Sequence, residues 1–195
     1  MIPAEEALKI LLEGNQQYST EHSIYYEELD RVRRQTYVTQ EPIAVIIGCS
    51  DARVPVEIIF NCKPGDLFVV RIAGNVLNVD IVGSVEYAIK YLGVNLVLVL
   101  GHSNCGVFNA AMSGDKFSFE LKGLIDKVRA AVYRANQYKE DIREHAIKGN
   151  VIETAHDVEE ICRRFTGDDP GRKIGVAGAY YDLGTGKVEI IRPIE

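Results

Sequence analysis

Short apolar runs alternate with amphipathic stretches along most of the chain. Four runs rich in β-branched and aliphatic residues end at a glycine or a loop, and they cover residues 43–48, 67–74, 95–101 and 173–181. Between the second and third runs, residues 81–92 ("IVGSVEYAIKYL") repeat apolar positions with the helical period. Strands that alternate with helices are typical of a parallel sheet. The sequence therefore predicts an α/β fold with a mostly parallel central sheet flanked by helices.

The two ends of the chain extend this plan. Residues 3–18 carry an apolar stripe and two glutamates in the first turn, which predicts an N-terminal helix. We expect this helix and the polar, tyrosine-containing residues that follow it to form a helical arm over residues 1–40. Residues 118–148 and 151–166 are expected to be helical. The terminal "GVAGAYYDLGTGKVEIIRP" predicts a hairpin and thus an antiparallel edge strand.

Length and composition indicate one domain. The chain has 195 residues, of which 47% are hydrophobic and 26% are charged, enough to bury a core of ordinary size. We find no repeat or linker, so we expect a single domain over residues 1–195, in which residues 41–195 form the α/β core. The net charge of −6 argues against a nucleic-acid partner. Without a long apolar run or a signal peptide, we expect no membrane association and a cytoplasmic location.

Thiols and an imidazole follow two of the expected strands. Four cysteines are too few for a disulfide scaffold in a chain of this size, which favours metal or thiol chemistry. Cys49 follows the first strand, and His102 and Cys105 follow the third. Because the carboxyl ends of parallel strands open onto one crevice, these side chains should meet. Two sulfurs and one ring nitrogen suit zinc, with a fourth position left for water or for Asp51, as in catalytic zinc sites.

The same motif also contains a carboxylate and a guanidinium. Asp51 and Arg53 are two residues apart and can fold onto one side of a turn. Arg53 would then keep Asp51 ionised and away from the metal, which leaves a position for water. Zinc lowers the pKa of bound water towards ~7 and so provides hydroxide at neutral pH. The alternatives are an ordinary surface ion pair and a Cys49 that serves only as a small buried residue.

These motifs together resemble the beta class of carbonic anhydrases. The segments "CSDARVP" (49–55), "PGDLFVVR" (64–71), "GSVEYA" (83–88) and "GHSNCG" (101–106) occur in that family's order and approximate spacing, and the similarity extends over roughly the whole chain. The resemblance implies a zinc lyase that reversibly hydrates carbon dioxide to bicarbonate and a proton through zinc-bound hydroxide. It also implies a homodimer or a dimer-based tetramer, with the N-terminal helix reaching over the neighbouring subunit.

The resemblance assigns roles around the metal. It implies that Cys49, His102 and Cys105 are zinc ligands. It also implies that Asp51 and Arg53 form a catalytic dyad, in which the carboxylate either binds the metal in a resting form or pairs with the arginine in the working form. Asp51 is therefore expected both as a catalytic residue and as a conditional fourth metal ligand.

The resemblance also assigns a substrate pocket. Gln40, nine positions before the first metal cysteine, matches a glutamine that is expected to donate hydrogen bonds to the substrate oxygens. Gly106 matches a backbone N–H beside the metal. Phe68 and Tyr87 match apolar pocket residues that are contributed across the subunit interface. A narrow apolar pocket with one or two donors is sufficient for a small uncharged substrate.

One departure from the family bears on regulation. A subgroup has a regulatory bicarbonate pocket that requires a tryptophan three residues before the first metal cysteine, where this chain has Ile46. Val54 and Arg71 do match that pocket, but the chain contains no tryptophan. We therefore expect the state in which the carboxylate is paired with Arg53, and no inhibition by bicarbonate.

Other functions remain open on the sequence alone. A hydrolase of carbon disulfide or carbonyl sulfide would use the same scaffold and the same zinc chemistry. A non-catalytic zinc-binding module would hold a permanently four-coordinate metal and would accelerate no reaction. A thiol redox protein is disfavoured, because Cys49 and Cys105 do not form a CxxC pair.

Overall fold

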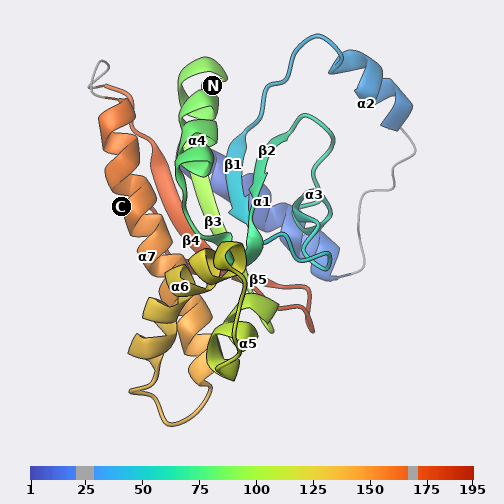
Figure 1. Ribbon diagram of the computed structural model, residues 1–195. Coiled ribbons are helices and arrows are strands. Elements are labelled where there is room, and N and C mark those ends of the chain that lie inside the picture. The colour runs from blue at the N-terminus through green and yellow to red at the C-terminus, as the bar shows by residue number, and fades with distance from the viewer. Residues whose placement is uncertain (21–28, 167–170) are drawn as a thin grey trace.

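A five-stranded sheet forms the centre of the structure, a computed structural model that describes residues 1–20, 29–166 and 171–195 (Figure 1). The strands lie in the order β2-β1-β3-β4-β5. Their bounds are β1 Ala44–Gly48, β2 Leu67–Arg71, β3 Leu96–His102, β4 Gly175–Tyr181 and β5 Val188–Arg192. The first four strands are parallel, and β5 pairs antiparallel with β4. This arrangement confirms the predicted α/β fold with its antiparallel edge strand.

Helices cover both faces of the sheet (Figure 1). They are α1 Ala4–Ser19, α2 Leu29–Gln35, α3 Val56–Ile59, the 3-10 turn η1 Ala73–Asn75, α4 Val79–Tyr91, α5 Gly106–Ser113, α6 Phe119–Ala135 and α7 Ile142–Phe165. Leu96, Leu98 and Leu100 of β3 pack on the side of α1 and α3. Val97 and Val99 pack on the opposite side, with α4 and α7. Burial on both faces explains why this strand is apolar without a break.

Helix α1 packs against its own sheet. Its stripe buries three apolar residues: Ala4, Ala7 and Leu11. Asn15 continues the stripe and is also buried, although it is polar. Its Nδ2 donates to the carbonyl oxygens of Ile59 (3.2 Å) and Gly186 (2.9 Å). Its Oδ1 accepts from the Val188 N–H (2.7 Å), so this one side chain joins α1, α3 and the C-terminal hairpin.

The largest difference from the predicted elements lies in the C-terminal helices. The sequence predicted helices over residues 118–148 and 151–166 with a break between them. Instead, α6 ends at Ala135, and α7 continues without a break through Gly149 and Asn150. The predicted position of the break was therefore wrong, although the helical character of both stretches was right.

Side-chain contacts explain the position of that break. Asn150 does not end the helix, because its side chain is buried and its Nδ2 donates to the Gly74 carbonyl oxygen (3.2 Å). The turn falls instead between Asn136, which caps the end of α6, and Asp141, which begins α7 with φ 52°. Asparagine and aspartate tolerate this left-handed conformation better than most residues do.

Part of the predicted N-terminal arm lies outside the described residues, namely residues 21–28. After them, α2 covers Leu29–Gln35. None of the helices in the described ranges combines the length and the apolar composition that crossing a bilayer requires.

Candidate metal centre

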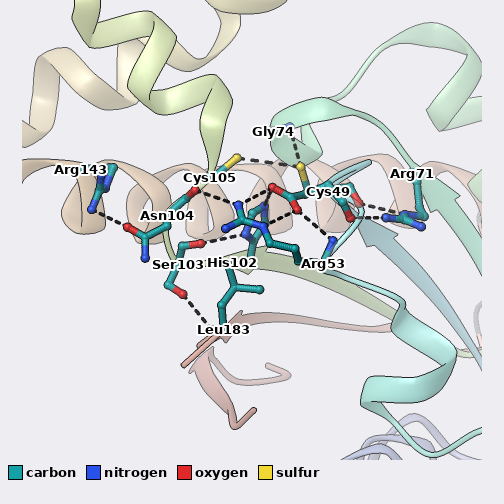
Figure 2. A network of polar contacts seen from close by, with 11 residues as sticks. Cys49, Arg53, Arg71, Gly74, His102, Ser103, Asn104, Cys105, Arg143 and Leu183 are labelled. Atoms are coloured by element: carbon teal, nitrogen blue, oxygen red, sulfur yellow. Dashed lines mark hydrogen bonds and ion pairs between the residues drawn. The ribbon is translucent and has the colours of Figure 1, made fainter. Parts of the chain in front are cut away.

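Two neighbouring strands bring the predicted metal ligands together. Cys49 directly follows β1, and His102 is the last residue of β3, which pairs with β1 in parallel. Cys105 follows three residues later and caps helix α5. The ligand atoms of these three residues all lie within 4.8 Å of one another. As predicted, the three side chains lie together at the carboxyl edge of the sheet (Figure 2).

The imidazole of His102 points an unpartnered nitrogen into this group. The ring is completely buried, and its Nδ1 lies 2.9 Å from the Ser103 carbonyl oxygen, to which it donates. This bond leaves Nε2 with a free lone pair, and Nε2 has no hydrogen-bond partner among the described residues. A buried nitrogen without a partner is costly unless a ligand binds it. The tautomer is the one that a metal ligand needs.

The sulfur atoms have the spacing that zinc requires. The Sγ atoms of Cys49 and Cys105 lie 3.9 Å apart, and both residues are 2% exposed. A tetrahedral zinc ion with Zn–S bonds of about 2.3 Å places two sulfur ligands about 3.8 Å apart. Distance, burial and ligand type therefore all fit a zinc ion held by these two cysteines and His102.

The pKa values of the two thiols are shifted in opposite directions. The pKa of Cys49 is lowered to about 4, because its sulfur accepts a hydrogen bond from the Cys105 thiol. The Gly74 N–H also donates to this sulfur (3.3 Å) and stabilises the thiolate further, while burial acts in the opposite direction. The pKa of Cys105 is raised by the same sulfur–sulfur bond and by burial. The pair thus favours a thiolate at Cys49, and a bound cation would displace the proton that remains on the pair.

Asp51 lies beside the group of three ligands but is turned towards Arg53. The Nε and Nη2 atoms of Arg53 donate to the two carboxylate oxygens of Asp51 at 2.9 and 2.8 Å, and the Arg53 backbone N–H donates as well (3.0 Å). This guanidinium holds the pKa of Asp51 well below its usual range. The nearer carboxylate oxygen is 3.9 Å from His102 Nε2. The carboxylate is therefore ionised, close to the metal position and held by the arginine.

Arg71 fixes the loop that carries these residues. Its Nε donates to the Cys49 carbonyl oxygen (2.9 Å), and its Nη2 donates to the Asp51 carbonyl oxygen (2.6 Å) (Figure 2). Arg71 ends β2 in register with Gly48, the last residue of β1. The sequence had indicated Arg71 only as a match to a regulatory pocket. No signal in the sequence shows that its side chain reaches the backbone of residues 49 and 51.

The predicted substrate residues are only partly brought to the metal. Gly106 begins α5 next to Cys105, at the end of the helix where backbone N–H groups have no partner within the helix. Gln40 lies before the start of β1, at the opposite end of that strand from the metal group. Phe68 lies on β2, in register with Val45 of β1 and below the carboxyl edge, and Tyr87 lies on α4. Within one chain, these last three residues do not join the metal group.

Comparison with known proteins points to one family. The carbonic anhydrase family model matches residues 44–188. Carbonic anhydrase 2 of Mycobacterium tuberculosis is 44% identical over 107 residues, which cover 55% of this chain and 52% of that protein. The match therefore spans about half the length of that relative. The carbonic anhydrase of Mycolicibacterium smegmatis is 31% identical over 191 residues, which cover 94% of this chain and 91% of that protein.

Solved structures agree with this match. The β-carbonic anhydrase of Coccomyxa, solved in complex with acetazolamide, superposes with a TM-score of 0.74 at 26% identity, and the alignment covers 94% of this chain and 86% of that one. A β-carbonic anhydrase of Aspergillus fumigatus shares the fold with a TM-score of 0.73 at 23% identity, over 96% of this chain and 89% of that one. With this family match, this shared fold and a group of two cysteines and a histidine that could hold a metal, the chain belongs to the β-carbonic anhydrase family.

Proposed function

We propose that this chain is a zinc-dependent carbonic anhydrase, which reversibly hydrates carbon dioxide to bicarbonate and a proton. The observation that supports this activity is the buried group of Cys49, His102 and Cys105, with an unpartnered His102 Nε2, beside a carboxylate held by an arginine. When bound, zinc would supply a Lewis acid that lowers the pKa of a coordinated water molecule. We expect the protein to act in the cytoplasm, as one domain made of an arm (residues 1–40) and a core (residues 41–195).

In this proposal, Asp51 and Arg53 control access to the fourth metal position. The Asp51 carboxylate lies next to the three proposed ligands, 3.9 Å from His102 Nε2, so it would be the carboxylate available to a bound metal. Arg53 prevents this by holding both carboxylate oxygens, which keeps the position free for solvent. The Arg53 guanidinium holds the pKa of Asp51 low, so this carboxylate would be an ionised hydrogen-bond acceptor beside the metal position.

The substrate pocket in this proposal needs a second copy of the chain. Gly106 offers its N–H within the same subunit. Gln40, Phe68 and Tyr87 lie away from the metal group of their own chain, so they would serve the site of a neighbouring copy. This supports the expected homodimer or dimer-based tetramer, in which each site is completed across the interface.

A purely structural zinc module is less consistent with the geometry. Structural zinc sites are closed by four protein ligands, whereas here three ligands are buried together and the nearest carboxylate is held by Arg53. The three-ligand arrangement with a free position is that of a catalytic site. The alternative function, hydrolysis of carbon disulfide or carbonyl sulfide on the same scaffold, is distinguished by the experiment described next.

Zinc content and hydration rate, measured on the same preparation, test the proposal. We expect about one zinc per chain and rapid hydration in a stopped-flow assay. The Cys105→Ser variant should lose both, whereas Cys162→Ser, which changes an equally buried thiol outside the metal group, should keep both. Asp51→Ala should keep zinc and lose most of the rate. Full hydration without zinc, or a zinc-loaded chain that hydrolyses carbonyl sulfide but does not hydrate carbon dioxide, would contradict the proposal.

A further inference from the structure

Arg53 has a third contact, which comes from the other metal-binding loop. Besides its bonds to Asp51, its Nη2 donates to the backbone carbonyl oxygen of Asn104 (3.3 Å). Asn104 lies between the ligands His102 and Cys105. The orientation of the guanidinium therefore depends on where the Asn104 carbonyl is held.

The backbone of Asn104 is in an uncommon conformation, and its side chain is anchored. Its φ is 55°, in the left-handed region. The Asn104 side chain accepts a hydrogen bond at Oδ1 from Arg143 Nη2 (2.6 Å). Arg143 also donates through Nη1 to Oδ1 of Asn109 on α5 (3.0 Å). One guanidinium thus bonds both to the loop between His102 and Cys105 and to the helix that follows it. Figure 2 shows the bond to Asn104.

Arg143 lies on a helix that is packed into the core next to the metal group. It lies in the first turn of α7, and Ala146 and Ile147 in the next turn are buried in the same apolar cluster as Cys49 and Cys105. A cation in the first turn faces the positive end of the helix dipole, which is unfavourable for the helix. The position of this arginine is thus better explained by its bonds to the metal loop than by the stability of α7.

We propose that Arg143 and Asn104 are positioning residues for the Asp51–Arg53 pair. Arg143 fixes the Asn104 side chain and, through it, the carbonyl oxygen that holds Arg53. Arg53 in turn keeps the Asp51 carboxylate turned away from the metal. The catalytic consequence rests on the proposed function, but the mechanical link from α7 to Arg53 does not.

The variants Arg143→Gln and Asn104→Gly test this link in the zinc-loaded protein. Glycine keeps the left-handed backbone of residue 104 and removes only the acceptor side chain. The Nε–H signal of Arg53, assigned by its loss in Arg53→Lys, should exchange with solvent about three- to tenfold faster in each variant, as expected for the loss of one hydrogen bond. We expect kcat to fall by a similar factor, with zinc content and Tm unchanged.

Two further variants make the test specific. Asn104→Asp retains an acceptor for Arg143 and should retain slow exchange at Arg53. Arg134→Gln removes an exposed arginine of α6 that pairs with Glu153 and should change neither readout. Because Arg143 and Asn104 act through one bond, the double variant should be no worse than either single variant.

The possible results separate the two proposals. Exchange at Arg53 that matches the parent in both single variants would overturn the positioning role, as would a double variant whose effect is the product of the two single effects. If the variants show the predicted exchange changes but the zinc-loaded parent protein hydrates no carbon dioxide, the positioning role stands and the proposed function is refuted.

Discussion

Ser103 is not a proposed metal ligand, but its backbone carbonyl oxygen determines the tautomer of the neighbouring His102. Its backbone N–H donates to the Tyr181 carbonyl oxygen (2.9 Å), and its Oγ accepts from the Leu183 N–H (2.8 Å). These two bonds fix the Ser103 carbonyl, which accepts from His102 Nδ1. The end of β4 therefore sets the tautomer of the metal-binding imidazole, because the proton on Nδ1 leaves Nε2 free.

Arg71 provides a residue-scale prediction. Its two bonds to the backbone of residues 49 and 51 hold the loop from which one metal ligand and the Asp51 carboxylate project. The Arg71→Gln variant should reduce kcat/KM for hydration by about tenfold, since two charge-assisted hydrogen bonds to that loop are lost. Stopped-flow hydration with zinc analysis measures the effect. Arg129→Gln on α6, which also removes an exposed arginine, is the control, and equal rates in the two variants would contradict the role of Arg71.

The residue types at the site could be predicted from the sequence, whereas their supports could not. Cys49, His102 and Cys105 follow two apolar runs, and the topology of a parallel sheet brings the ends of such runs together. The contacts of Arg71 and Arg143 depend on where a side chain from another element reaches the backbone, and no local pattern encodes this. Such supports become visible only when the strands and helices are assembled.

At the scale of elements, helix α1 approaches α3 closely at one point. A Cβ atom on Gly14 would lie 2.0 Å from the Phe60 carbonyl oxygen. From the sequence alone, a glycine inside a helix only weakens it. The structure shows the compensation, because without a side chain at this position the two helices can pack in contact.

An alanine scan of two helical glycines tests this packing. Gly14→Ala should lower the free energy of unfolding by at least about 2 kcal/mol, because the clash is with a backbone atom that cannot rotate away. Gly123→Ala on the exposed side of α6 meets nothing within 4 Å and should raise that free energy by up to about 1 kcal/mol. Chemical denaturation of both variants gives the comparison. A Gly14→Ala protein as stable as the parent would show that α1 is free to move away from α3.

Element types were predictable here, and element ends were less so. The apolar runs located the described parallel strands to within a few residues. Burial on both faces leaves an unbroken hydrophobic signal in β1, β3 and β4, whereas the edge strand β2 is only partly buried. The helical break was misplaced because Gly149 and Asn150 look like a helix end. In the folded protein, the Asn150 side chain instead donates a hydrogen bond to the Gly74 carbonyl oxygen. Such long-range satisfaction of a polar side chain has no local signature.

At the scale of the whole molecule, an aromatic patch lies at one edge of the sheet, formed by the partly buried Phe68 of β2 and the exposed Tyr87 and Tyr91 of α4. The rings of Phe68 and Tyr87 lie 6.1 Å apart, and those of Tyr87 and Tyr91 are stacked at 5.4 Å. Tyr91 is 76% exposed and Val79, on the same helix, is 81% exposed. Exposed apolar surface at the edge strand of a sheet marks an interaction site. Two members of this patch are residues that the family resemblance assigns to a neighbouring subunit's pocket.

This patch gives a prediction for the assembly. Tyr91→Asp places a charge in the stacked aromatic patch, so we expect the proposed oligomer to dissociate into chains of 21.7 kDa, as measured by sedimentation or light scattering. Hydration should fall by at least about tenfold with dissociation, because Phe68 and Tyr87 would no longer reach a neighbouring site. Tyr133→Asp, at an 80% exposed position on α6, should leave mass and rate unchanged. If dissociated Tyr91→Asp chains retained full activity, each site would be complete within one subunit, and the cross-subunit roles proposed for Gln40, Phe68 and Tyr87 would be wrong.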